Sequence, residues 1–244
     1  NDIEQAQAIF NEINGKELSD SEIKEIKSEQ EPSKQKPLFS KTYRFPILLA
    51  FLIAFFNQLS GINAFLYYAP RIFEAAGLEE SSALLSSIGI GVTNLIFTLL
   101  GLYLIDKIGR RLLMIVGSIG YIISLTLVSI AFLKGWQGIS IPIFLFLFIA
   151  SHAIGQGAVI WVFISEIFPD NLRAQGQSFG SSVHWILAAL ITLFMPVALS
   201  AFPNPGYVFM LFSGMMVLQL VFVLYLMPET KGVSLERLSK TLIK

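Results

Sequence analysis

Residues 45–69 read FPILLAFLIAFFNQLSGINAFLYYA, a run without a single charged side chain. A helix needs roughly 20 mainly apolar residues to cross a bilayer core of ~30 Å, so this run is long enough to span a membrane. Five further stretches qualify, namely residues 81–105, 112–133, 141–164, 178–199 and 208–227. Six such runs, separated by short polar links, predict an all-α polytopic membrane protein with six transmembrane helices.

The composition supports this class and excludes several others. Of the 244 residues, 54% are hydrophobic and 14% are charged, whereas a soluble domain carries about 25% charged residues. The formal net charge is zero, which disfavours nucleic acid as a partner, and the absence of Cys excludes disulfides, Cys-ligated zinc and a thiol nucleophile. We expect no metal site and no cofactor.

Charged residues divide the chain into three parts. Nearly half of them lie in residues 1–44, where two short helical patterns predict a cytoplasmic helical linker segment with either a connecting or a regulatory role. Residues 45–230 form the predicted six-helix bundle, and residues 231–244 a cytoplasmic tail.

Lys and Arg near the helix ends lie mainly on one side, which the positive-inside rule makes cytoplasmic. The protein is thus expected in the cell membrane, with the lipid bilayer as a partner and both chain ends in the cytoplasm. The basic side carries Lys41, Arg44, Lys107, Arg110, Arg111, Arg173, Lys231, Arg237, Lys240 and Lys244, against Arg71 and Lys134 on the other.

Polar residues inside the first span indicate a break in its helix. In a straight helix at 100° per residue, Gln58 and Asn63 would point about 140° apart. A break at Ser60-Gly61 would bring them together, and glycine permits such a break. Because unpaired polar groups are costly in hydrocarbon, we expect these side chains to face the bundle interior or a cavity.

The fourth span is interrupted at the corresponding position, by His152, Gly155, Gln156 and Gly157. Spans one and four begin two predicted three-helix inverted repeats. Glycine-interrupted helices at matching positions of two repeats indicate the binding site of a transporter. The alternative is that these glycines only allow close helix packing.

The polar groups at membrane depth have a common chemistry. They are amides and aromatic rings without a carboxylate, which suits hydroxyl groups and the C–H face of a pyranose better than an ion. A single Asn within a span, such as Asn94, can also serve only to hydrogen-bond a neighbouring helix, whereas an intramembrane His beside a Trp suggests a binding site. The predicted substrate-binding residues are Asn57, Gln58, Asn63, Asn94, Trp161, His184 and Trp185.

Acidic residues accompany the basic ones at the cytoplasmic helix ends. Topology alone explains the Lys and Arg residues, but not the acids beside them. Pairs across the bundle would hold one conformation of a two-state device and release in the other. The predicted cytoplasmic charge network contains Asp106, Arg110, Arg111, Glu166, Arg173 and Glu229.

Four strings together closely resemble the sugar porter family of the major facilitator superfamily. They are QLSGIN at 58–63 followed by Tyr67 and Tyr68, DKIGRR at 106–111, EIFP at 166–169 with Arg173, and PETKG at 228–232. The resemblance implies the C-terminal half of a twelve-helix carrier of small sugars, whose N-terminal six-helix half is a missing partner. It also implies sugar contacts at Gln58, Asn63, Asn94 and Trp161, an extracellular gate at Tyr67 and Tyr68, and the charge network described above.

Two departures concern the identity of the sugar. The paired glutamines of the family read Asn57-Gln58 here, and His184 stands where relatives carry Gln or Asn. The leading interpretation is transport of a monosaccharide, a hexose or pentose, by alternating access. A membrane-embedded enzyme is the first alternative, although no nucleophile and base can be paired by spacing. A sensor that binds sugar without transporting it is the second.

Overall fold

The computed structural model describes Gln5, Ile9, Phe10 and residues 37–136 and 138–243. The chain divides into two units after Pro37. Most of the predicted linker segment, residues 1–44, lies outside the described residues, so its helical patterns stay a prediction. The helices below belong to residues 38–243.

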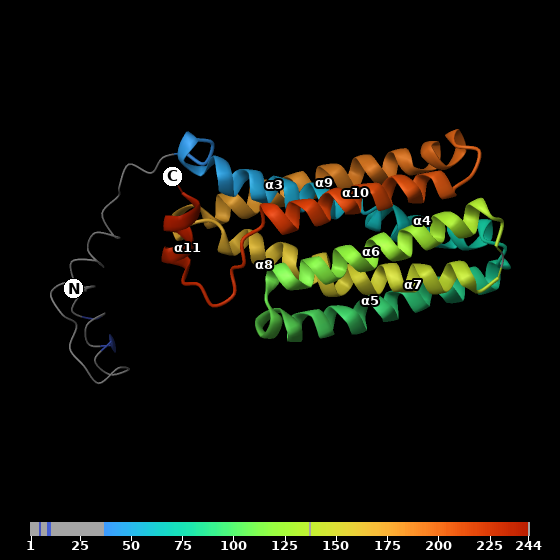
Figure 1. The fold of residues 1–244 in the computed structure, drawn as a ribbon, viewed down its shortest axis with the longest axis horizontal. Helices are drawn as coiled ribbons and strands as arrows, with labels where there is room; N and C mark the ends of the chain where they lie inside the picture. Colours follow the sequence, from blue (N-terminus) through green and yellow to red (C-terminus); the bar gives the residue numbers. More distant parts are fainter. Residues whose placement is uncertain (1–4, 6–8, 11–36, 137, 244) are drawn as a thin grey trace. The chain divides into compact units, whose positions relative to one another are not determined.

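The described part of this second unit contains helices and no strands (Figure 1). The elements are a 3₁₀ turn at Lys41–Tyr43, α3 (Arg44–Leu59), α4 (Ile62–Ala75), α5 (Glu80–Ile108), α6 (Arg110–Leu133), α7 (Ser140–His152), a π-helical segment at Ala153–Gly157, α8 (Ala158–Glu166), α9 (Asp170–Ala201), α10 (Gly206–Tyr225) and α11 (Leu235–Leu242).

Six helical segments of the described chain are long and apolar enough to cross a membrane, and each contains most of one predicted span. They are Lys41–Ala75, Glu80–Ile108, Arg110–Leu133, Ser140–Glu166, Asp170–Ala201 and Gly206–Tyr225. The largest boundary error is in the fifth span, where the helix begins at Asp170 rather than at 178. Its first two turns are mainly polar, so hydropathy alone misses them.

Each span of the first three-helix set has the same packing contacts as its counterpart in the second set. Helices α6 and α10, the third and sixth spans, pack against each other. Helix α3 of span one packs on α9, as α7 of span four packs on α5, and α4 packs on α5 as α8 packs on α9. Successive spans alternate in direction, so spans one and four run oppositely (Figure 1). The bundle is therefore built from two inverted three-helix repeats, as predicted.

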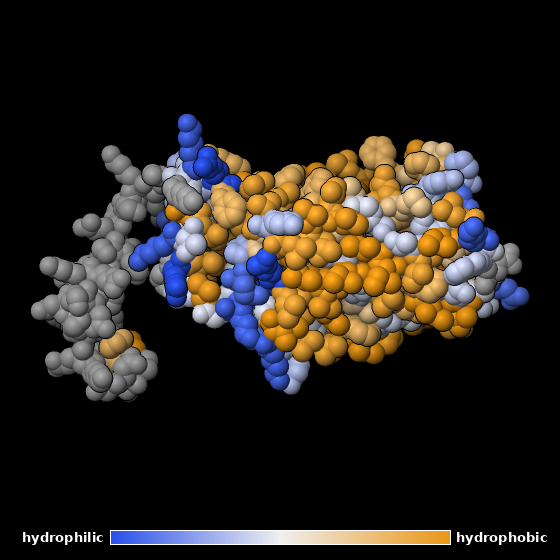
Figure 2. Space-filling model, viewed as in Figure 1, coloured by the Kyte–Doolittle hydropathy of each residue, from blue (hydrophilic) through white to orange (hydrophobic). Residues whose placement is uncertain are grey.

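Two spans are much less covered than the others. In the apolar 18-residue stretch of α5, and in that of α9, only 17% is buried inside the protein, against 44–61% in the other four spans. Figure 2 shows a broad hydrophobic surface over the helices, with hydrophilic residues concentrated at the two ends of the bundle. The second and fifth spans thus present long apolar sides outward, as expected against lipid or another membrane bundle.

The predicted break in the first span is confirmed. Gly61 has a φ of +81°, a left-handed conformation that separates α3 from α4. The Ser60 hydroxyl donates to the Asn57 carbonyl at 2.6 Å and accepts from the Ile62 N–H at 3.3 Å, which satisfies backbone groups freed by the break. A Cβ at Gly61 would lie 2.6 Å from the Phe212 ring, so glycine is needed for space as well.

The fourth span is interrupted differently from the prediction, because the chain stays helical. Ala153–Gly157 form a π-helical segment between α7 and α8. A Cβ on Gly155 would lie 2.9 Å from the Gly117 Cα, so this glycine allows α6 to approach closely. For Gly155 the close-packing alternative therefore holds, while Gly157 lies against His152.

The predicted tail contains a helix that hydropathy did not reveal. Helix α11 begins after Ser234, whose hydroxyl accepts from the Arg237 N–H at 3.3 Å as an N-cap. Leu238 and Leu242 are both buried, in a cluster with apolar residues of α3, α8 and α10. These two leucines dock α11 on the end of the bundle that carries the α5–α6 and α8–α9 links, here called the basic end.

Candidate functional site

Gln58 is the centre of a buried polar cluster beside the break. Its Nε2 donates to Asn57 Oδ1 at 3.0 Å and lies 3.2 and 3.1 Å from the two ring nitrogens of His184. Its Oε1 accepts from Asn63 Nδ2 at 2.9 Å. Gln58 is fully buried, and these bonds use both of its N–H groups and its carbonyl. The break therefore brings Gln58 and Asn63 together, as the helical angles predicted.

A cavity of about 230 Å³ opens in front of this cluster. Six of the seven predicted binding residues are among its lining, and Gln58 lies behind its wall. No carboxylate is among the lining residues, and the described residues contain no group of acidic and His side chains arranged to hold a metal ion. The cavity is lined by Asn57, Ile62, Asn63, Leu66, Asn94, His152, Gly157, Ile160, Trp161, His184 and Trp185.

His184 lies between two indole rings. Its ring centroid is 5.0 Å from that of Trp161 and 5.0 Å from that of Trp185. Trp161 is 36% exposed and Trp185 is 59% exposed, so both rings have free surface on the cavity side. The cavity thus combines amide groups, two imidazoles and two indole faces.

The two predicted gate tyrosines line an adjoining cavity. This second cavity, of about 450 Å³, shares Asn63 and Trp185 with the first and is otherwise bordered by Tyr67, Tyr68 and residues of α9. Tyr67 is 68% exposed and Tyr68 is partly buried. Both tyrosines therefore stand next to the amide-lined cavity, on the α4 side of the break, and their role as a gate stays a prediction.

The charge network is assembled at the basic end around Arg110. Its Nε and one terminal nitrogen donate to the two Glu166 oxygens at 3.2 and 2.7 Å, a bidentate pair that joins α6 to α8. The other terminal nitrogen donates to Asp106 Oδ1 at 2.8 Å. The Thr230 hydroxyl also donates to Glu166, at 2.6 Å, so the segment after α10 joins the same cluster.

Glu229 acts on backbone groups rather than on an arginine side chain. Its two carboxylate oxygens accept from the N–H groups of Arg110 and Arg111 at 3.0 and 3.1 Å, at the N-terminus of α6. A carboxylate at this position satisfies free N–H groups and interacts favourably with the helix dipole. Gly109, with a φ of +96°, leaves room for it, since a Cβ there would lie 2.5 Å from a Glu229 oxygen.

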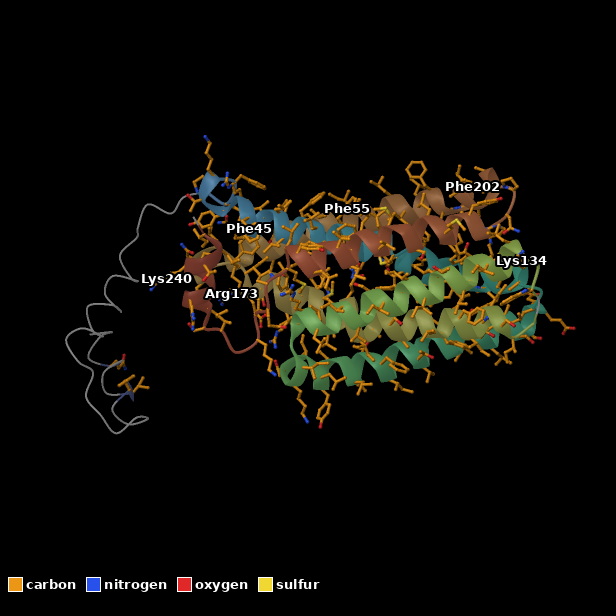
Figure 3. All side chains as sticks on the ribbon, viewed as in Figure 1. Phe45, Phe55, Lys134, Arg173, Phe202 and Lys240 are labelled. Carbon is orange, nitrogen blue, oxygen red and sulfur yellow. The ribbon has the colours of Figure 1, made fainter. Side chains whose placement is uncertain are left out.

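Two members of the predicted network have other partners. Arg173 bonds to Asp170 and to the Ser165 carbonyl, and not to Glu166. The Arg111 side chain donates to the Val223 carbonyl, near the end of α10. Arg173 still lines the same basic-end cavity as Arg110 and Glu166. In Figure 3, Arg173 and Lys240 lie at this end, and Lys134 lies at the other.

The family model described as "Sugar (and other) transporter" matches residues 1–242. The chain belongs to the sugar transporter family. This result confirms the resemblance to the sugar porters of the major facilitator superfamily, a family of transporters and not of enzymes, and it removes the membrane-embedded enzyme as an alternative.

Several sugar transporters are similar over nearly the whole chain. The arabinose-proton symporter of Bacillus subtilis is 32% identical over 98% of this chain, and a facilitated glucose transporter of the dog is 32% identical over 97%. A structure of the proton:xylose symporter XylE bound to 6-bromo-6-deoxy-D-glucose matches with a TM-score of 0.80, at 31% identity over 98% of the chain. The chain covers 52%, 49% and 52% of these three proteins, so it spans about half their length.

Sequence reasoning did not place one titratable residue of the cavity wall, His152, among the binding residues. His152 lines the cavity, and its Nδ1 contacts the Tyr121 hydroxyl in the bundle interior. The sequence singled it out only as part of the interrupted fourth span. The one signal for it was general, namely that a His within a membrane span marks a site or a pathway.

Proposed function

We propose that this chain is the C-terminal half of a carrier that moves a monosaccharide, a hexose or a pentose, across the cell membrane by alternating access. The observation that carries the proposal is the cavity between the two interrupted spans, lined by amides, imidazoles and indole rings without a carboxylate. Relatives named for arabinose, xylose and glucose support this class of substrate.

The hydrogen-bonding capacity of the cavity suits a polyol. Gln58 uses both of its N–H groups on protein partners and holds Asn57 and Asn63 in place. Among the described residues, the Asn57 amide nitrogen, with its two N–H groups, and the Asn63 carbonyl oxygen have no hydrogen-bond partner, which leaves donors as well as an acceptor for sugar hydroxyls. The exposed faces of Trp161 and Trp185 provide apolar surface for the C–H face of the ring. Direct contact between Gln58 and the sugar remains a prediction.

The proposed carrier needs a second wall for this cavity. Trp185 is more than half exposed, and the two least covered spans, α5 and α9, carry Asn94, His184 and Trp185. Polar groups exposed to lipid are costly, so a second membrane bundle is the expected occupant of this side. The relatives, about twice as long as this chain, support an N-terminal six-helix half as that bundle.

The basic end supports a two-state device. The Arg110–Glu166 pair joins α6 to α8, and Thr230 adds the segment after α10, so any movement of α6 relative to α8 would have to break these bonds. The excess of Lys and Arg at this end supports its placement in the cytoplasm, together with both ends of the chain.

Reconstitution in sugar-loaded vesicles tests the proposal. The chain co-expressed with its first half should give saturable, stereospecific counterflow of a monosaccharide, and the chain alone should insert without transporting. Sugar binding without counterflow would indicate a sensor instead. Saturable uptake by the chain alone would contradict the half-carrier interpretation and indicate a homodimer.

A further inference from the structure

A line of buried polar side chains runs from the cavity into the contact between α6 and α10. It starts at His152 on the cavity wall, passes to Tyr121 and Gln156, and continues to Gln219 and Ser118. The four residues behind His152 are fully buried. The sugar contacts proposed above use none of these bonds, although buried polar networks are costly unless every member is bonded.

The direction of every hydrogen bond in the line follows from its inner end. The Ser118 hydroxyl lies 2.7 Å from the Met114 carbonyl, which only accepts, so its single proton points there. Ser118 must then accept from the Gln219 amide nitrogen, 2.8 Å away. This orients Gln219 so that its carbonyl oxygen faces Gln156 and accepts from the Gln156 amide nitrogen.

The same logic fixes the proton on His152. With its nitrogen given to Gln219, Gln156 turns its carbonyl oxygen to the Tyr121 hydroxyl, 3.1 Å away, and accepts the tyrosine proton. Tyr121 then offers only a lone pair to His152 Nδ1. Nδ1 must therefore carry a hydrogen, and in the neutral ring Nε2 is left as a bare acceptor.

The bare Nε2 of His152 lies at the cavity, where a ligand can reach it. The Nε2 edge of His152 lies beside Gly157, where a Cβ would be 3.5 Å from Nε2, and both residues line the cavity. Among the described residues Nε2 has no hydrogen-bond partner, and it is not one of the unpartnered polar atoms that are fully buried. No carboxylate lines the cavity, so nothing there compensates a second proton on the ring.

We propose that His152 is a further sugar-binding residue whose Nε2 accepts a hydrogen bond from a substrate hydroxyl, and that Tyr121 and Gln156 are positioning residues that fix it as an acceptor. This inference rests on the proposed function, because it names one more contact of the same site. It differs from the amide contacts in kind, since an amide can rotate to offer a donor or an acceptor, whereas this imidazole is held to accept.

The first test reads the proton position directly. ¹⁵N-histidine NMR of the complete carrier, with the His152 resonances identified by their loss in His152→Phe, should show a protonated Nδ1 and a bare Nε2 in the absence of sugar. Tyr121→Phe should convert this single tautomer into a mixture. A protonated Nε2 in the unmodified carrier would overturn the proposal, whether or not sugar is bound.

The second test reads the contact through binding. One of a series of deoxyfluoro sugars, which lack a single O–H donor, should bind about tenfold more weakly than the parent, the loss expected for one neutral hydrogen bond. His152→Phe should bind this analogue and the parent equally. Tyr121→Phe, fully buried behind His152, should weaken binding of the parent sugar. Ser129→Ala is the matched control, because it removes another buried α6 hydroxyl that bonds to α10, at the Gly206 carbonyl.

The outcomes separate this inference from the proposed function. If the unmodified carrier binds no monosaccharide, the proposed function fails, and the tautomer measurement still stands by itself. A second outcome is that the unmodified carrier binds sugar while every analogue that binds it more weakly than the parent also binds His152→Phe more weakly than the parent. In that case the proposed function stands and the contact at His152 is refuted. Equal effects of Tyr121→Phe and Ser129→Ala on affinity would refute the positioning role.

Discussion

Replacing Gly61 by alanine tests whether the break in the first span creates the binding site. Two costs arise at this position. A left-handed conformation costs a non-glycine residue about 1–2 kcal/mol, and Gly61 has a φ of +81°. The new Cβ would also lie 2.6 Å from the Phe212 ring, and overpacking of this kind costs about 1–3 kcal/mol. We expect Gly61→Ala to destabilise the carrier by about 2–5 kcal/mol in total.

Denaturation of the purified carrier and equilibrium sugar binding together measure this effect. Gly214→Ala is the matched control, since a Cβ there meets no atom within 4 Å and should leave both readouts unchanged or slightly improve stability. Phe212→Leu combined with Gly61→Ala should recover the overlap cost but not the conformational one. Because the break holds Gln58 and Asn63 together, Gly61→Ala should also weaken sugar binding. Stability and affinity equal to those of Gly214→Ala would refute the reasoning.

Three further changes test other parts of the structure, and a fourth experiment tests the topology. Trp161→Ala should weaken sugar binding by about 1–2 kcal/mol through the lost ring face; unchanged affinity would remove it from the site. Glu166→Gln should weaken the pair that joins α6 to α8 and raise cysteine labelling of the basic-end cavity, whereas unchanged labelling would leave these charges a topological role alone. Leu238→Ala should cost about 2–5 kcal/mol of local stability and speed hydrogen exchange in α11, with the membrane spans as internal reference. In a carrier whose first half is freed of cysteines, a cysteine at Ser140 should be labelled only from outside and one at Lys240 only from the cytoplasm; the opposite pattern would reverse the topology.

Hydrophobic length made the six spans predictable, and helical geometry made the first break predictable. A 100° step per residue separates Gln58 from Asn63, so the need for a bend at Gly61 follows from the spacing of the two amides in the sequence. The start of α9 and the whole of α11 could not be found in this way. Both are polar on average, and α11 forms because Leu238 and Leu242 dock on a surface built by distant helices.

The partners of individual charges were harder to predict than their location. All the acids and bases of the predicted network lie at the basic end, as their positions after the spans required. Their pairing depends on side-chain reach, which sequence spacing does not give. Arg110 takes both Asp106 and Glu166, while Arg173 turns to Asp170 on its own helix. Glu229 bonds to backbone N–H groups, a partner that a count of opposite charges does not consider.

The two interrupted spans use different backbone conformations to turn two of their side chains towards the same cavity. In a straight helix at 100° per residue, His152 and Trp161 would point about 180° apart, a worse separation than that of the two amides in the first span. A π-helical segment, with its i→i+5 bonds, turns less per residue, so Ala153–Gly157 rotates the two side chains towards the same cavity. The first span achieves this with a left-handed glycine and a true break. The fourth span does so while remaining helical, which keeps Gln156 inside the bundle, where it bonds to Tyr121, the residue that contacts His152 Nδ1.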